Sequence, residues 1–196
     1  YDYEIEITNA DKINKLAKLA RIAQEKWSKK DITKRISILQ SFKDALLENK
    51  DELIDALKID TGRTTISKQE LYGLCGSIDR WCKSAPTILN NKERQSKSIP
   101  HIAIQKTHDP YPLLGVISPW NFPIAIFVGQ MIASLVCGNV TIVKPAEQTS
   151  NLSYVIFKLL LKAGLPKNAA ALILGKGEEI CPLIFSNINL QNVVFT

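Results

Sequence analysis

Three short segments of this 196-residue sequence hold side chains whose types and spacing could do chemistry. The first is Ser118–Pro123, in which prolines flank Asn121 and stiffen the loop that carries it. An amide N–H held in place can stabilise an oxyanion, and removing such a donor typically costs about 3 kcal/mol of transition-state binding. Asn121 could equally cap a helix that starts near Ile124. The spacing alone favours neither role.

The second segment is Lys144-Pro145-Ala146-Glu147, which places one ammonium and one carboxylate close together. Both groups can hydrogen-bond a ribose diol. A carboxylate in that position would repel a 2′-phosphate, so Glu147 would favour NAD over NADP. The ordinary alternative is an exposed ion pair on a loop, which contributes little to stability. The two residues by themselves favour that alternative.

The third segment is Gly175-Lys176-Gly177, which precedes an expected helix. In the dinucleotide-binding pattern G-x-G-x-x-G the third small residue would be Ile180, and no acidic residue follows at the required distance. The fingerprint is therefore incomplete, although the Gly175 backbone could still approach a cofactor closely. No metal site is expected, because the 4 cysteines and 2 histidines show no ligand spacing.

The elements that must hold these segments begin with a helical region from Asn9 to about Leu89, in which apolar residues recur at helical spacing. Asp31 and Asp51 are the predicted N-caps of its second and third helices, and Thr61-Gly62 is the predicted stop before the fourth. Residues 96–107 then predict a turn followed by one exposed strand.

Residues 111–143 carry no charged side chain, which raises the question of a membrane span. Prolines, glycines and polar amides divide this stretch into pieces shorter than the ~20 residues that a spanning helix needs. We interpret it as buried core: a strand over 113–118, a helix over 124–137 and a strand over 140–143. Ser150 is the predicted N-cap of the next helix, which ends at Gly164.

Further strands are predicted over 169–174 and 193–195, so that strands and helices alternate from residue 113 onward. This pattern indicates an α/β fold: N-terminal helices followed by a partial parallel, doubly wound, Rossmann-like sheet. We expect three parts, residues 1–95, 96–110 and 111–196. Ligands of such sheets bind at the carboxyl ends of the strands, and each of the three segments directly follows a predicted strand.

Charge and cysteine usage narrow the class of protein. The formal net charge is +6, but the basic side chains recur at helical spacing among acidic ones, so we expect a solvated helix face and no nucleic-acid partner. Residues 1–7 contain acidic side chains and do not resemble a secretory signal. Unpaired cysteines fit a reducing compartment, so we expect a cytoplasmic protein without a transmembrane segment.

Several motifs, taken in order and spacing, resemble the aldehyde dehydrogenase superfamily, and the likeness covers nearly the whole chain. Within that superfamily, Pro123–Gln130 and Lys144–Thr149 look most like the dehydrogenase domain of proline utilization A, which oxidises L-glutamate γ-semialdehyde (in equilibrium with Δ1-pyrroline-5-carboxylate) to glutamate with NAD. The motifs that carry the superfamily resemblance are Ala23–Trp27, Asp60–Arg63, Gly115–Pro123, Gly138-Asn139, Lys144–Glu147, Gly164–Pro166 and Val194–Thr196.

The resemblance implies a role for each candidate residue. Asn121 would be the oxyanion-hole amide, and Lys144 with Glu147 would bind the adenosine ribose of NAD. Asn121 would also contact the cofactor, and the remaining implied cofactor contacts are Ser118, Pro119, Trp120, Ala146 and Gly175. The implied substrate is a small aldehyde, and the implied full-length protein is a homo-oligomer; the exposed strand near residues 101–106 also suggests association through an edge.

The family's nucleophilic cysteine and general-base glutamate would lie beyond Thr196, so residues 111–196 would form a C-terminally truncated βαβ half of the NAD-binding domain. We therefore expect these 196 residues alone not to oxidise aldehydes; NADH production by the purified chain would contradict this. Two alternatives stay open: a dehydrogenase for another aldehyde, and a non-catalytic interaction module. A reading frame that continues into a glycine-rich cysteine motif would favour the enzyme.

Overall fold

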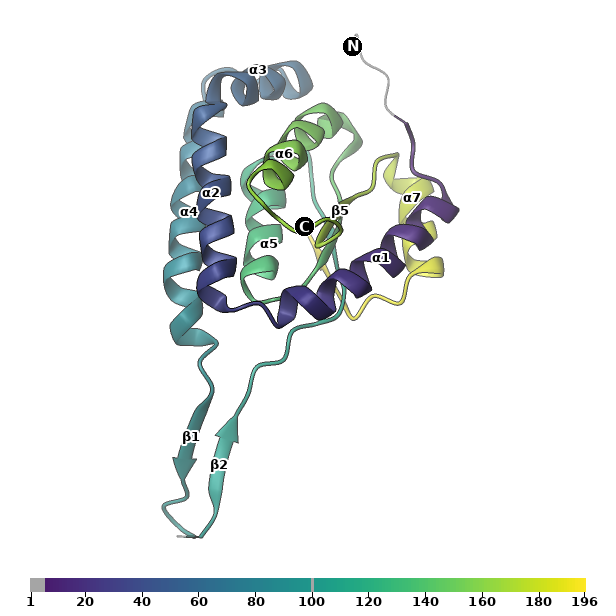
Figure 1. The fold of residues 1–196 in the computed structure, drawn as a ribbon. Coiled ribbons are helices and arrows are strands. Elements are labelled where there is room, and N and C mark those ends of the chain that lie inside the picture. The colour runs from purple at the N-terminus through teal and green to yellow at the C-terminus, as the bar shows by residue number, and fades with distance from the viewer. Residues whose placement is uncertain (1–5, 100) are drawn as a thin grey trace.

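The computed structural model describes residues 6–99 and 101–196, so most of the segment 1–7, which was compared with a secretory signal above, and Pro100 lie outside the described residues. The predicted helical region is confirmed (Figure 1). It consists of α1 (Ala10–Ser28), α2 (Ile32–Glu48), α3 (Lys50–Thr61) and α4 (Ser67–Ile88). Asp31 caps α2 as predicted, with its Oδ1 accepting from Thr33 N at 2.8 Å. Gly62, at φ 69°, ends α3 in the left-handed conformation that favours glycine.

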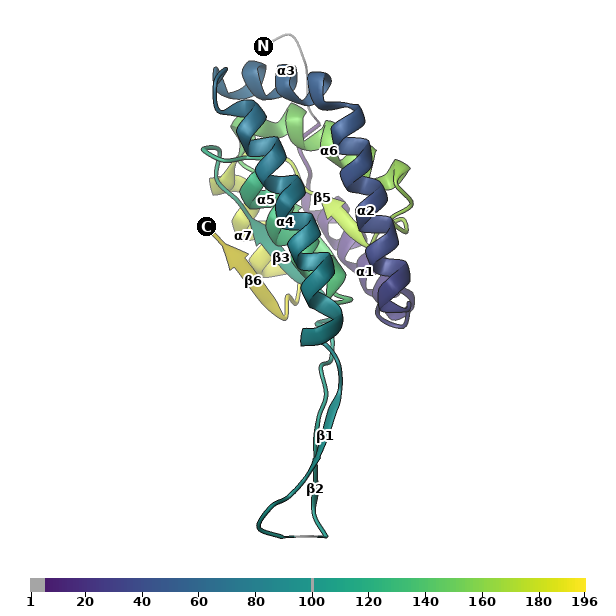
Figure 2. The ribbon, with the colours of Figure 1, turned by 90° about the vertical axis from the view of Figure 1, so that its left-hand side faces the viewer.

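The exposed strand predicted after α4 is one half of a hairpin. β1 (Lys92–Gln95) pairs antiparallel with β2 (Ala103–Lys106), and every residue of both strands is exposed. The hairpin projects away from the rest of the chain (Figures 1 and 2). The sequence analysis predicted only the second of these strands. The first, Lys-Glu-Arg-Gln, was missed because it has no alternation of apolar and polar residues.

The second half of the chain forms a parallel sheet, as predicted, in the order β5-β4-β3-β6. Its strands are β3 (Leu114–Ile117), β4 (Thr141–Lys144), β5 (Ala170–Leu172) and β6 (Asn192–Phe195). Helices α5 (Ala125–Val136), α6 (Ser150–Lys162) and α7 (Gly177–Asn187) connect them, with the short 3-10 helix η1 (Glu147–Thr149) before α6.

The central strands β3 and β4 are buried at every residue, which explains why the uncharged stretch is core. Within the described residues, we find no helix that combines the length and the apolar character needed to cross a bilayer.

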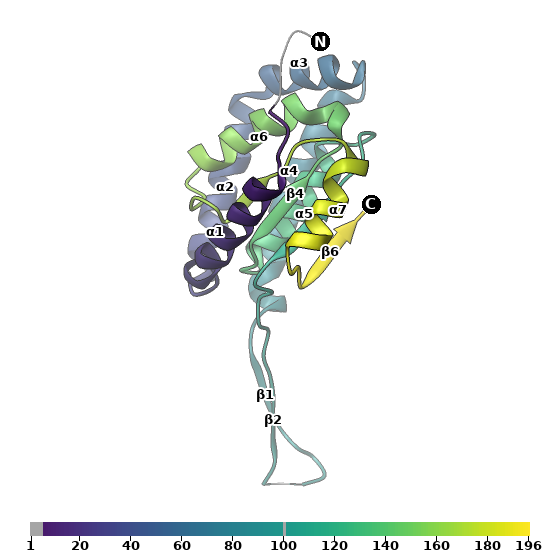
Figure 3. The same ribbon diagram turned by 90° about the vertical axis from the view of Figure 1, so that its right-hand side faces the viewer.

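The order of the strands fixes where a ligand crevice should lie. The chain steps from β3 to β4 to β5 in one direction, and α7 then returns it to the other side of β3, where β6 pairs. Helices α5 and α6 lie on one face of the sheet under α2, α3 and α4, and α1 and α7 lie on the other (Figures 1 and 3). The strand order therefore reverses between β3 and β6. In doubly wound sheets, ligands bind at the carboxyl end of such a switch point.

The N-terminal helices hold α5 at its C-terminal end, where backbone carbonyls lack partners within the helix. The Trp27 indole N–H donates to Leu135 O at 3.0 Å, and Arg35 Nε donates to Val136 O at 3.1 Å. Both side chains are buried, with Trp27 fully inaccessible to solvent. Burial of a carbonyl without a partner would cost about 1–3 kcal/mol, so these bonds fix the position of α5 against α1 and α2.

Candidate functional site

The first two predicted segments lie side by side at the carboxyl edge of the sheet. Ile117, the last residue of β3, is in register with Lys144, the last residue of β4. Ser118 N donates to Lys144 O at 3.2 Å, so the loop that leads to Asn121 leaves the sheet next to the Lys144 backbone. This loop also starts at the β3/β6 switch point, where Thr196 N donates to Ile117 O at 3.2 Å.

Lys144 and Glu147 form an ion pair, but it is not the fully exposed loop pair that the sequence analysis gave as the ordinary alternative. Lys144 Nζ lies 3.0 Å from Glu147 Oε2 and donates to Pro145 O at 2.9 Å. The Lys144 side chain is only 4% exposed, whereas that of Glu147 is 42% exposed. The ammonium is therefore held in the protein and the carboxylate reaches solvent.

The carboxylate of Glu147 is kept ionised by its surroundings. Burial alone would raise the pKa of Glu147, but hydrogen bonding from its own backbone N–H and the ammonium of Lys144 outweigh burial and lower that pKa. The backbone N–H of Gly177, at the start of α7, acts in the same direction. A negative charge next to a buried ammonium thus stands at the end of β4.

The third segment meets this pair through Gly177. A Cβ placed on Gly177 would lie 3.9 Å from Lys144 Nζ, so the N-terminus of α7 is next to the ammonium. Gly175 has a packing reason to be glycine: its φ is +144°, and a Cβ there would lie 2.6 Å from Ile180 Cγ1. The side chain of Ile180, the residue that broke the fingerprint pattern, fills the space beside Gly175.

Asn121 does not cap α5, so the capping alternative is wrong. The N-cap position of α5 is Ile124, which offers no side-chain bond. Instead Glu70 Oε1, from α4, accepts from Ile124 N at 2.8 Å and from Ala125 N at 3.0 Å. Among the described residues the Asn121 carboxamide has no hydrogen-bond partner, and the residue is exposed. Its donor capacity is therefore available to a ligand.

The segment between α3 and α4 holds the Asn121 loop from outside the sheet. The guanidinium of Arg63 donates to Asn121 O, lies 4.8 Å from the centroid of the Phe122 ring and pairs with Glu70 Oε2 at 3.2 Å. Sequence reasoning singled out neither Arg63 nor Glu70 as a functional residue. Arg63 is 58 residues from Asn121 in sequence, so no local pattern could join them.

Three of the four cysteines, which are all free thiols, lie in surroundings that raise their pKa values. Burial raises the pKa of Cys75, of Cys82 and of Cys137, and nearby charges only partly offset it for Cys137, next to Arg35. A thiol with a raised pKa carries little thiolate at neutral pH and is a poor nucleophile. These three residues are therefore structural.

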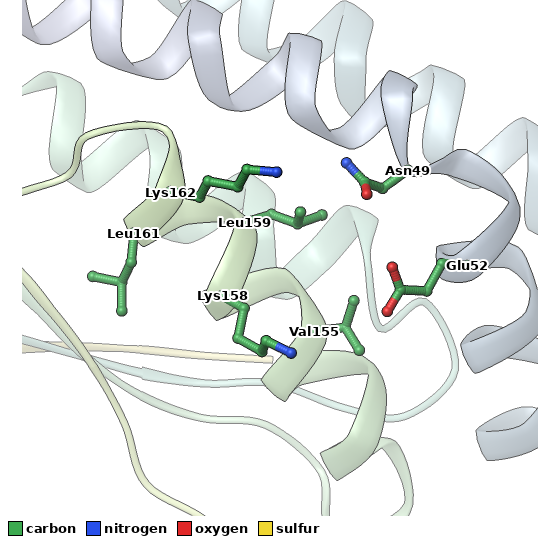
Figure 4. A pocket seen from close by; sticks show the side chains of 7 residues that line it. All are labelled: Asn49, Glu52, Val155, Lys158, Leu159, Leu161 and Lys162. Atoms are coloured by element: carbon green, nitrogen blue, oxygen red, sulfur yellow. The ribbon is translucent and has the colours of Figure 1, made fainter.

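A surface groove between the start of α3 and α6 lies apart from these residues (Figure 4). Two ammonium groups and one carboxylate border it. It shares no residue with the three segments at the carboxyl edge, and its lining is Asn49, Glu52, Val155, Lys158, Leu159, Leu161 and Lys162.

Comparisons with known proteins show the family of this chain. A family model described as the aldehyde dehydrogenase family matches residues 3–196. A protein of Mycolicibacterium smegmatis that carries the name succinate-semialdehyde dehydrogenase [NADP(+)] is 30% identical over 169 residues, which cover 86% of this chain and 33% of the relative. The chain thus spans about a third of the length of the curated relatives that it matches.

Solved structures with a similar fold include members of the same family. The structure named for aldehyde dehydrogenase PutA of Anabaena variabilis is 34% identical with a TM-score of 0.89, over 96% of this chain and 40% of that one. A variant of proline utilization A from Bradyrhizobium japonicum is 27% identical with a TM-score of 0.90, over 97% of this chain and 20% of that one. With the family model matching almost every residue, the chain belongs to the aldehyde dehydrogenase family.

Proposed function

We propose that this chain supplies the oxyanion amide and part of the cofactor cleft of an NAD-dependent aldehyde dehydrogenase. The observation that carries the proposal is the carboxamide of Asn121 at the carboxyl end of β3, which has no hydrogen-bond partner among the described residues because Glu70 caps α5 in its place. A polar side chain that is not needed for the fold, at the switch point of a doubly wound sheet, is positioned for a ligand.

In the aldehyde dehydrogenase reaction, a cysteine thiolate adds to the aldehyde carbon and the carbonyl oxygen becomes negative. The Asn121 carboxamide N–H would donate to that oxygen, and such a donor stabilises the transition state most when it is held in place before the charge develops. The bound NAD would supply the hydride acceptor. Cys75, Cys82 and Cys137, whose pKa values are raised by burial, are unsuited to the thiolate role.

Lys144 and Glu147 would hold the adenosine ribose. An ammonium has three N–H donors, and Lys144 uses two of them on Pro145 O and Glu147. One donor and a solvent-facing carboxylate thus remain for a ribose diol. The ionised Glu147 would repel a 2′-phosphate, which supports NAD even though several relatives are named for NADP(+).

A direct test of the cofactor is the ratio of NAD to NADP affinity in wild type and in Glu147→Gln, measured by fluorescence titration of the full-length gene product. We expect wild type to prefer NAD and the variant to lose most of that preference, because removal of the charge removes the repulsion. A preference that Glu147→Gln leaves unchanged would remove Glu147 from the ribose site.

The substrate that we favour is L-glutamate γ-semialdehyde, on the resemblance of Pro123–Gln130 and Lys144–Thr149 to proline utilization A and on the likeness to PutA structures. Succinate semialdehyde is the second candidate, because a relative carries that name. Both are short aldehydes that end in a carboxylate. Steady-state assays of the full-length gene product with each aldehyde should give the higher kcat/KM for L-glutamate γ-semialdehyde; the reverse order would transfer the assignment to succinate semialdehyde.

A further inference from the structure

We propose that Arg63 is a positioning residue for Asn121 and that Glu70 is the anchor through which Arg63 acts. This inference rests on the proposed role of Asn121. It concerns a segment that joins α3 to α4, on the helical side of the molecule and outside the sheet whose carboxyl edge carries the site. What joins the two regions is one guanidinium group with three separate contacts.

The contacts of Arg63 reach consecutive residues of the loop. One N–H of the guanidinium donates to Asn121 O, which fixes the peptide plane that follows the proposed catalytic side chain. The face of the same group lies 4.8 Å from the centroid of the Phe122 ring, within the range of a cation–π contact. A planar, charged fork can make both contacts at once, whereas a lysine ammonium has neither the fork nor the face.

Glu70 fixes the other end of the loop and the guanidinium itself. Its side chain is fully buried, and its two oxygens have different partners. Oε1 accepts from Ile124 N and Ala125 N, and Oε2 forms an ion pair with Arg63. The Arg63 side chain is 19% exposed, so the pair is largely withdrawn from solvent. The loop from Asn121 to Ala125 is therefore tied at both ends to a single ion pair.

The loop needs such support because little else holds the centre of it. Trp120, Asn121 and Phe122 are all exposed, and the Asn121 carboxamide has no partner of its own among the described residues. Pro119 and Pro123 restrict the backbone on either side of the loop, but a fixed backbone φ does not by itself set the direction of the Asn121 side chain. A donor displaced by about 1 Å can lower the rate of a reaction roughly 100-fold, so the aim of Asn121 matters for catalysis.

The experiment is a double-mutant cycle on kcat in the full-length gene product, with Arg63→Gln, Asn121→Ala and the double variant. We expect Arg63→Gln to lower kcat about 10- to 100-fold, with KM for NAD nearly unchanged. In the Asn121→Ala background we expect Arg63→Gln to have no further effect on kcat. Arg63→Lys, which keeps the charge beside Glu70 but loses the fork, should recover only part of the loss.

Arg21→Gln is the matched control, because Arg21 also donates through its guanidinium to a backbone carbonyl, that of Asn189, away from the site. It should leave kcat unchanged. A readout independent of activity is the side-chain amide signal of Asn121 in a ¹⁵N NMR spectrum, which should shift or broaden in Arg63→Gln while signals from α1 and α2 stay in place. This measurement also serves if the variant is too unstable for kinetics.

Two results would overturn the inference: an equal fall in kcat from Arg63→Gln in both backgrounds, which would mark a merely structural role, or an unchanged kcat and Asn121 signal in Arg63→Gln. A different result would contradict the proposed function and not this inference. If Asn121→Ala by itself leaves kcat unchanged, Asn121 is not the oxyanion donor, whatever Arg63 does to the loop.

Discussion

The buried ammonium of Lys144 determines the electrostatics at the end of β4. It is buried at the carboxyl end of the strand and donates a hydrogen bond to Pro145 O. It also helps to keep the partly exposed carboxylate of Glu147 ionised. An ion pair exposed on both sides would be screened by solvent and salt, but a pair with one member buried is screened much less. The charge of Glu147 is thus a fixed feature of the carboxyl edge of the sheet.

The pKa of Glu147 gives a test of this pair. Because folding lowers that pKa, the ion pair stabilises the fold above the unfolded value of about 4.5 and the contribution is lost as the pH falls through the folded value. We expect Lys144→Met to raise the pKa of Glu147, since the effect of burial remains and the ammonium is gone. A ¹³C NMR titration of the carboxyl group measures it. Lys158→Met, on α6, is the control, and an identical titration curve in Lys144→Met would refute the coupling.

Thiol reactivity tests the assignment of the cysteines. Cys75 and Cys82 are buried, and burial raises the pKa of each, so both should resist alkylation at neutral pH until the protein unfolds. Iodoacetamide labelling followed by mass spectrometry measures the rate at each site, with and without urea. Fast labelling of Cys75 or Cys82 in the native protein would show a reactive thiol where we find a structural one.

Residue types at strand ends were enough to predict Asn121, Lys144 and Glu147 as candidates, because the alternation of strands and helices shows which residues share an edge. The same reasoning could not choose between catalysis and capping for Asn121. That choice depends on Glu70, which is 54 residues away from Ile124 in sequence. The sequence also suggested that Gly175 approaches a ligand, whereas the structure supplies a packing reason for it in Ile180.

At the scale of elements, helices α5 and α6 take their N-terminal caps from other helices. Glu70 of α4 caps α5, and Asp60 of α3 caps α6 by accepting from Leu152 N at 2.9 Å. The predicted cap of α6, Ser150, is instead its first helical residue. Sequence patterns describe local caps, so a cap supplied by tertiary structure is invisible to them.

The boundary between α2 and α3 was also mispredicted. Asn49, and not Asp51, stands at the N-cap position of α3, and its side-chain Nδ2 donates to Ala45 O at 2.7 Å at the end of α2. Asp51 lies within the first turn of α3, where its charge still complements the helix dipole. The helices themselves were predicted because their apolar stripes are long, which makes their existence more certain than their ends.

The shared cap of α5 leads to a stability prediction. Glu70→Ala would leave the amides of Ile124 and Ala125 without an acceptor and Arg63 without its carboxylate, so we expect a loss of about 1–3 kcal/mol in the free energy of unfolding. Urea denaturation followed by circular dichroism measures it. Glu52→Ala, an exposed residue of α3, should change stability by less than about 0.5 kcal/mol. Equal effects of the two substitutions would contradict the capping role.

At the scale of the whole molecule, the parallel sheet followed from the sequence, but the hairpin did so only in part. A two-stranded hairpin is marginal on its own in water, and its free edges invite pairing with another chain. The β1–β2 arm also exposes Ile99, Ile102 and Ile104. We propose that it mediates self-association of the full-length protein.

Replacement of residues 93–105 by a short Gly-Ser turn tests that proposal. We expect the shortened protein to have a lower molar mass than wild type in size-exclusion chromatography with light scattering, because the exposed arm is its contact. Its circular dichroism spectrum should stay close to that of wild type, since every residue of β1 and β2 is exposed. An unchanged oligomer would assign the interface to another surface.

The proposed oxyanion role of Asn121 is tested most directly by the effect of Asn121→Ala on kcat in the full-length gene product. The assay uses L-glutamate γ-semialdehyde and NAD, and a separate titration measures NAD binding. If the Asn121 carboxamide stabilises the oxyanion, kcat should fall roughly 100- to 1000-fold while the Kd for NAD changes little. A kcat within a factor of two of wild type would contradict the oxyanion role of Asn121, because the loss of such a donor must weaken the binding of the transition state.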